Sequence, residues 1–134
     1  MRIITSDGKR YVDIGNSDVW KSIYATVISS FGLRKNKVAK AIDFLANGVC
    51  KSEDGYETAR QFNMIRDELS RITPEKAVYD LDKKKEKPSW LTELSPVITS
   101  CGNLYTTADG DDMIHEIVSI FSYAEIVGVD ATVE

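Results

Sequence analysis

The chain has 134 residues, of which 43% are hydrophobic and 28% charged, so we expect one domain, residues 1–134, with an ordinary core. No apolar stretch approaches the roughly 20 residues that a membrane helix needs, and residues 1–15 lack the apolar region of a signal peptide. These features predict a cytoplasmic protein in which Cys50 and Cys101 are free thiols. Two cysteines and one histidine also argue against a dedicated zinc site.

Charge is distributed unevenly along the chain, although the net charge is only −4. Residues 1–52 carry nine Lys and Arg against four Asp, whereas residues 88–134 carry eight carboxylates and no Lys or Arg. If the last segment forms one surface, it repels nucleic acid and attracts a basic protein. The alternative is that the fold mixes these carboxylates with the basic side chains of the first third.

The first residues predict a β-hairpin. Residues 2–5 and 10–14 alternate apolar and polar side chains around Asp7 and Gly8, a pair typical of a type I′ turn, in which both central residues have positive φ. The side chains expected to face the core are Ile3, Tyr11 and Ile14.

Apolar side chains at three- and four-residue spacing predict helices over residues 18–31 and 56–72, with a shorter helix between them that ends at Gly48. Ser17 is the expected N-cap of the first helix, and Gly32 its terminator. Residues 77–81 fit either a strand or one helical turn. Residues 83–87 are a charged loop, and residues 96–99 fit a short strand.

The last part of the chain, residues 103–134, predicts a strand at 104–106, an acidic turn, a long amphipathic helix and a closing strand at 129–133. Thr107 or Asp109 is the expected cap, with Asp111 and Asp112 in the first turn of the helix. Together these elements predict an α+β fold: a small mixed or antiparallel sheet packed with three to four helices.

No motif points to catalysis. His115 falls on the polar face of the last helix, and the carboxylates at residues 109–112 lack the ligand spacing of a calcium loop. Helix capping accounts for these carboxylates without a metal, and no phosphate-binding glycine loop occurs. We therefore expect a protein that is not an enzyme and that binds no cofactor or metal. The alternative is a small hydrolase or a metal-dependent enzyme.

Several stretches resemble a family of bacterial immunity proteins. They are TARQF at 58–62, IRDEL at 65–69, TPEKAVYD at 73–80, PSW at 88–90 and NLYTTADG at 103–110. The resemblance implies a non-catalytic antitoxin of the polymorphic-toxin type, as found in contact-dependent growth inhibition. It would bind a cognate toxin domain and cover its active site or a nearby surface. Such toxins are frequently nucleases, whose basic cleft an acidic surface fits.

The expected partner surface contains two groups of acids and two aromatic side chains, and it binds neither nucleic acid nor membrane directly. The C-terminal acidic cluster is Asp109, Asp111, Asp112 and Glu116; the central acidic cluster is Glu53, Asp54 and Glu57; the aromatic anchors are Trp90 and Tyr105. Trp90 is alternatively a side chain folded onto the core. The alternative function is a regulatory or adaptor domain without a toxin partner.

Overall fold

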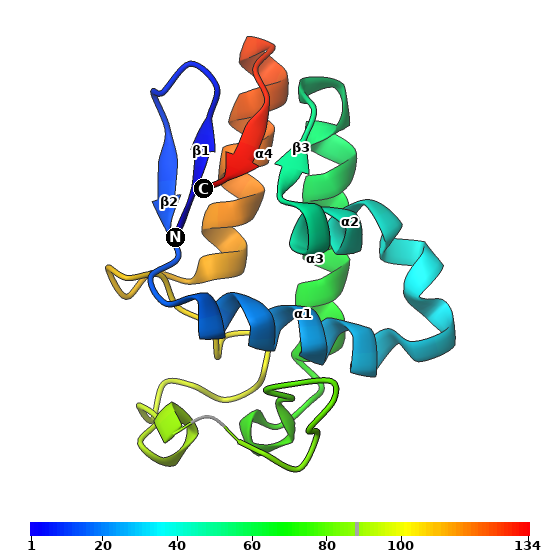
Figure 1. The fold of residues 1–134 in the computed structure, drawn as a ribbon, viewed down its shortest axis with the longest axis vertical. Coiled ribbons are helices and arrows are strands. Elements are labelled where there is room, and N and C mark those ends of the chain that lie inside the picture. The colour runs from blue at the N-terminus through cyan, green and yellow to red at the C-terminus, as the bar shows by residue number, and fades with distance from the viewer. Residues whose placement is uncertain (88) are drawn as a thin grey trace.

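The computed structural model describes residues 1–87 and 89–134, and in this part of the chain four short strands pack with four α-helices (Figure 1). The strands form one antiparallel sheet in the order β2-β1-β4-β3, which confirms the predicted α+β class. The bounds are β1 Arg2–Thr5, β2 Tyr11–Asp13, α1 Ser17–Phe31, α2 Ala39–Asn47, β3 Val49–Cys50, α3 Gly55–Leu69, α4 Met113–Val127 and β4 Ala131–Val133.

The first hairpin forms where the alternation predicts it, but its second strand faces the other way. β1 and β2 pair so that Ile3 lies opposite Val12, and both side chains are buried. Tyr11 therefore points to the opposite face and is 62% exposed, so the prediction that it faces inward is wrong. The turn is not type I′ either, because only Gly8 has a positive φ (71°), while Asp7 accepts hydrogen bonds within the loop.

The helix ends follow the predicted glycines, but the start of α1 differs by one residue. Asn16, not Ser17, is its N-cap, and the Asn16 Oδ1 accepts the N–H of Asp18 at 2.8 Å. Glycines with positive φ follow α1, α2 and α4, as the sequence predicts: Gly32, Gly48 and Gly128. A 3-10 stretch, Gly32–Val38, links α1 to α2.

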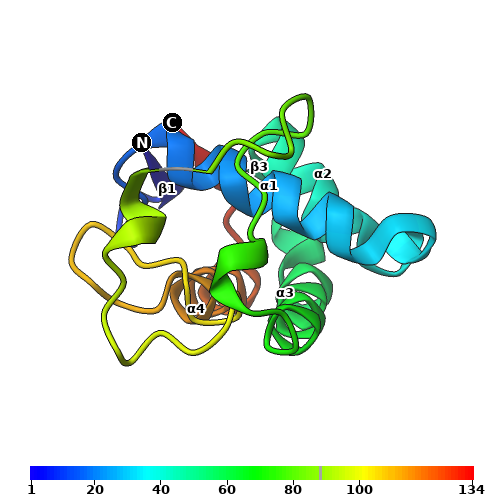
Figure 2. The ribbon, with the colours of Figure 1, turned by 90° about the horizontal axis from the view of Figure 1, so that it is seen from below.

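Helices α3 and α4 lie side by side and antiparallel, as Figure 1 and Figure 2 both show. Gly55, the first residue of α3, allows a close approach, because a Cβ there would lie 2.5 Å from the carbonyl oxygen of Phe121 in α4. The core between the helices is aromatic. The Phe121 ring lies 4.7 Å from the ring of Phe44 in α2 and 5.7 Å from that of Phe62 in α3.

The segment 70–112 crosses the end of this helix pair and, among its described residues, contains no strand. Residues 77–81 therefore form neither the strand nor the helical turn considered for them, and the strands expected at 96–99 and 104–106 are wrong, with a single bridge from Thr106 to Asp112 in place of the latter. Val78 shows why, since its backbone bonds to α1 side chains: its N–H donates to Thr26 Oγ1 at 2.9 Å, and its carbonyl accepts from Ser22 Oγ at 2.9 Å. Pro88, which belongs to one of the stretches that resemble immunity proteins, lies outside the described residues.

Two further differences concern lengths. α3 ends at Leu69, earlier than predicted, because the carbonyl of Ile72 accepts the N–H of Cys101 and the chain turns away there. β3 was not predicted, since two residues are too few to show an alternation. It pairs with β4, which lies within the predicted closing strand.

Candidate functional site

The C-terminal acidic cluster lies in a tight turn that is fixed to the edge of the sheet. Thr107 is buried, and its backbone N–H and hydroxyl bond to the backbone of Asp111 at 2.8 and 3.1 Å. The next residue, Ala108, donates its N–H to the carbonyl of Asp13 in β2 at 3.0 Å. The turn therefore presents its carboxylates from a defined position beside β2.

Asp112 has a structural role that the other members of this cluster lack. It is the N-cap of α4, because its Oδ1 accepts the N–H of His115 at 3.2 Å, so the expected caps, Thr107 and Asp109, are wrong. The same carboxylate forms an ion pair with Arg66 of α3 at 2.6 Å. Both side chains are about a third exposed, which makes the pair half-buried. Asp112 thus joins the start of α4 to the end of α3.

The remaining carboxylates gather around one hollow, which we call the acidic hollow. It is lined by Tyr11, Val12, Asp13, Thr107, Asp109, Asp111 and Glu116. Its four carboxylates come from β2, from the turn and from α4, and none of them forms an ion pair within the described residues. Sequence reasoning missed Tyr11 and Asp13, because they lie far from the other lining residues along the chain.

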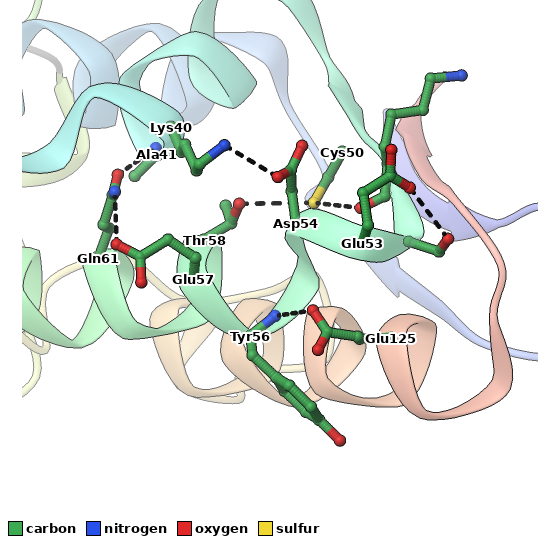
Figure 3. Close-up of polar contacts among 12 residues, drawn as sticks. Lys40, Ala41, Cys50, Glu53, Asp54, Tyr56, Glu57, Thr58, Gln61 and Glu125 are labelled. Carbon is green, nitrogen blue, oxygen red and sulfur yellow. Dashed lines mark hydrogen bonds and ion pairs between the residues drawn. The ribbon is translucent and has the colours of Figure 1, made fainter.

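Two acids of the central cluster, Asp54 and Glu57, have cationic partners, and Figure 3 shows that of Asp54. Lys40 Nζ lies 2.9 Å from Asp54 Oδ1. Arg60 and Gln61 both donate to Glu57, and Arg60, as the larger influence, helps to lower the pKa of Glu57 to about 2. Glu53 is exposed and accepts only a long bond, 3.4 Å, from a neighbouring hydroxyl within the described residues.

The structure does not bring the two clusters together. At one end of the α3–α4 pair, Glu125 accepts the N–H of Tyr56 at 2.9 Å, beside the central cluster (Figure 3). At the other end, Arg66 meets Asp112. Each helix has 15 residues, so the two ends are about 22 Å apart at 1.5 Å per residue. The clusters are therefore separate surfaces.

The two candidate aromatic anchors are not equivalent. Tyr105 is only 2% exposed, and its hydroxyl lies 3.0 Å from Ser22 Oγ and 2.9 Å from Thr26 Oγ1. Burial raises the pKa of Tyr105 to about 12. Trp90 packs edge-on against Tyr105, with ring centroids 6.2 Å apart, and is only half-buried. Tyr105 is thus a core side chain, and Trp90 is folded back against it.

The fold also pairs part of the acidic last segment with basic side chains from the first half of the chain. Glu134 lies 2.7 Å from Arg2, and Asp130 lies 3.4 Å from Lys51. At these positions the fold therefore mixes acidic side chains of the last segment with basic side chains of the first part of the chain, as the alternative interpretation predicts. The acidic hollow is where the negative charge remains concentrated.

Catalytic groups do not converge in the described part of the chain. There, no group of three or more His, Cys, Asp or Glu side chains is placed to hold a metal ion. His115 is exposed, while Cys50 and Cys101 are buried, and burial raises the pKa of Cys101 to about 11. A thiol of this kind is a poor nucleophile near neutral pH. None of the described helices has both the length and the apolarity to cross a membrane.

The described part of the chain is thus an α+β domain with an acidic hollow at the edge of its sheet. A family model described as Immunity protein 70 matches residues 5–133. The chain therefore belongs to this family of immunity proteins, and its expected partner is a toxin. No curated protein and no solved structure matches the chain.

Proposed function

We propose that this protein is a cytoplasmic antitoxin that binds a cognate toxin domain of the polymorphic-toxin type, as in contact-dependent growth inhibition, and that this toxin is a nuclease. Membership of the immunity protein family supports the antitoxin function. The acidic hollow supports the nature of the partner. Inhibition is stoichiometric, by covering the active site or a surface close to it.

The single observation that carries the nuclease assignment is the grouping of unpaired carboxylates around the hollow. A nuclease binds phosphates with Lys and Arg, so its cleft is basic. Asp13, Asp109, Asp111 and Glu116 offer such a cleft four negative charges within one hollow. Complementary charges also accelerate the encounter of the two proteins, which matters because an uninhibited toxin molecule acts catalytically.

Tyr11 gives the same surface an aromatic contact. It lines the hollow and is 62% exposed, and tyrosine is enriched among the residues that dominate binding energy in interfaces. It takes the place of Tyr105, which is buried. We therefore propose Tyr11, Asp13, Asp109, Asp111 and Glu116 as the toxin-binding residues, with Asp112 positioning the turn.

The central acidic cluster and Trp90 have a smaller part in this proposal. Asp54 and Glu57 already have cationic partners, which a toxin would have to displace. Glu53 remains accessible, but it lies at the far end of the helix pair. Trp90 lines an apolar groove with Val19 and Leu94, and it contacts a toxin only if the interface extends that far.

Co-expression with the toxin domain encoded next to this protein tests the antitoxin function. We expect growth rescue and co-purification of a stable complex. Failure of both refutes the proposal. If growth is rescued but the toxin has no nuclease activity in vitro, the nuclease assignment is refuted and the antitoxin function is not.

A matched pair of charge-reversal variants tests the acidic hollow. Asp109→Lys with Asp111→Lys is expected to weaken toxin binding by about 100-fold or more, chiefly through the loss of steering and the gain of like-charge repulsion. Asp43→Lys with Glu53→Lys changes the net charge equally, and we expect a much smaller effect. Asp43 lies beside Val49 of β3, at the opposite edge of the sheet from β2, and Glu53 lies at the other end of the helix pair. Equal losses in both variants would show that only net charge matters and would remove the site assignment.

A further inference from the structure

Within the part of the chain that the structure describes, no helix covers the outer face of the sheet. Helices α3 and α4 lie on one side of the sheet, and Figure 2 shows β1 and both chain ends at the opposite edge of the molecule. Strand alternation places one set of side chains on this outer face. They are Arg2, Ile4, Tyr11, Asp13, Val49, Thr132 and Glu134.

These side chains form two rows across the strands. In the first row Tyr11 lies opposite Ile4, Ile4 opposite Thr132, and Thr132 opposite Val49. Tyr11 and Val49, at the two edges of the sheet, are 62% and 44% exposed. The first row is therefore mainly apolar and crosses all four strands.

The second row is charged and carries both signs. Arg2 of β1 lies opposite Asp13 of β2, and on its other side it pairs with Glu134 at 2.7 Å. The Arg2 and Glu134 side chains are each about half exposed, 48% and 51%. An apolar row beside a row of alternating charge is a surface that can match a copy of itself.

We propose that the outer sheet face binds a second copy of this chain, about a twofold axis that runs parallel to the strands between β1 and β4. Such an axis places β1 over β4 of the second copy and β2 over its β3. The charge of Arg2 then faces Glu134 of the second copy, and Tyr11 faces its Val49. Every contact occurs twice, as in all twofold interfaces.

The charge pattern favours a second copy over the toxin across β1, β4 and β3, whereas Tyr11 and Asp13 of β2 also line the acidic hollow, so the toxin and a second copy compete for these two residues. Arg2, at the centre of the second row, pairs with Glu134 and lies opposite Asp13, so this row offers a basic toxin one net negative charge, against the four carboxylates of the acidic hollow. A second copy supplies both a carboxylate for that arginine and an apolar row for Ile4 and Tyr11. The strands contribute only two to four residues each, so the interface is small and the dimer is weak.

Sedimentation velocity over a wide range of protein concentration tests the dimer in the wild-type chain without toxin. We expect the dimer fraction to rise with concentration and to be lost in Val49→Lys and in Tyr11→Lys. Tyr56→Lys is the matched control, because Tyr56 is 50% exposed but lies at the start of α3. Circular dichroism verifies that each variant is folded.

A charge swap tests the second row. Arg2→Glu is expected to abolish the dimer, since it leaves three carboxylates in line. Combining Arg2→Glu with Glu134→Arg again places opposite charges opposite each other across the axis, at positions 2 and 134 of the two copies, and is expected to restore the dimer. A swap that fails to do so, while both variants remain folded, contradicts the proposed axis.

Wild-type protein that stays monomeric at every concentration overturns the proposal, as does a dimer that survives both sheet-face substitutions. Val49 does not line the acidic hollow, so Val49→Lys is expected to retain toxin binding. Loss of toxin binding in that variant, with a monomeric wild type, would assign the face to the toxin instead. The dimer proposal and the antitoxin proposal therefore fail independently.

Discussion

The two ends of the α3–α4 pair carry acidic clusters that look alike in the sequence and differ in the folded protein. At the start of α3, Asp54 and Glu57 have cationic partners, Lys40 and Arg60. At the start of α4, among the cluster's acids in the described chain, only Asp112 has such a partner, Arg66. Asp109 and Asp111 remain exposed beside further carboxylates.

The difference comes from what each helix start lies against. Lys40 belongs to α2, which packs near the first turn of α3, and Arg60 follows Glu57 by one helical turn. The start of α4 lies instead against β2, whose nearest charged side chain there is another acid, Asp13. Counting carboxylates along a chain therefore locates an acidic segment, whereas the packing around it decides whether the surface is acidic.

The largest effect is expected at Asp112, where one carboxylate serves two partners. Asp112→Ala removes the N-cap of α4 and leaves half-buried Arg66 without its ion pair, and we expect the free energy of unfolding to fall by about 2 kcal/mol. Urea unfolding followed by circular dichroism measures this.

Asp112→Asn separates the two roles, because the amide oxygen still caps the helix while the charge is lost. We expect a smaller loss, about 1 kcal/mol or less. If both variants unfold like the wild type, Asp112 is not structural and belongs with the free acids of its cluster.

The next largest effect on stability is expected at Tyr105, whose buried hydroxyl bonds segment 70–112 to α1 at the same end of the helix pair. Tyr105→Phe removes the hydrogen bonds to Ser22 and Thr26 and should cost about 1 kcal/mol. In the wild type, burial raises the pKa of Tyr105 to about 12, from an ordinary value of 10.0. Its stabilising contribution is therefore complete below pH 10 and is lost as the pH rises toward 12.

The free energy of unfolding, measured between pH 8 and pH 12, tests whether stability falls in this direction. Cys101 adds to the same alkaline loss from a lower pH, because burial raises its pKa from 9.0 to about 11. The Tyr105→Phe variant should lose less stability between pH 10 and pH 12 than the wild type. Tyr79 and Tyr123, whose pKa values are raised by hydrogen bonds to Asp18 and Asp7, contribute equally to the loss in both proteins. An identical alkaline profile in both proteins would contradict the assignment.

Much of the fold was predictable from side-chain spacing. The helices were found because their apolar stripes face a core that any packing would require, and the ends of α1, α2 and α4 because glycine suits positive φ. Segment 70–112 was misread because its backbone bonds to Ser22 and Thr26, which lie on α1, rather than to a neighbouring strand. A local pattern does not reveal a partner of that kind.

The candidate site was predictable only in part, for a related reason. The charge count located Asp109 and Asp111, which line the acidic hollow. It did not locate Asp13 or Tyr11, because the backbone bond from Ala108 to β2 joins segments far apart in the sequence. Nor did it show that Asp112 is held by Arg66.

The stability that the central acidic cluster contributes should decrease in acid, because it depends on an exposed ion pair. Arg60 and Gln61 hold the pKa of Glu57 at about 2, against an ordinary value of 4.5. The contribution of Glu57 to stability is thus present above pH 4.5 and declines as the pH falls toward 2. Glu57→Gln is expected to flatten this part of the profile slightly, with little change at pH 7, because exposed pairs contribute little.

The smallest effect on stability is expected at the acids that matter most for binding. Asp109→Asn with Asp111→Asn removes two exposed charges that repel Asp13 and Glu116, so the free energy of unfolding should change by less than about 0.5 kcal/mol and tend upward. Urea unfolding at low and high salt measures this, since salt screens the repulsion in the wild type and should narrow the difference between the proteins. A clear loss of stability would mean that these side chains hold the turn before α4. Their negative charge would then be incidental, and the contrast between the two ends of the helix pair would no longer distinguish a binding surface from a structural one.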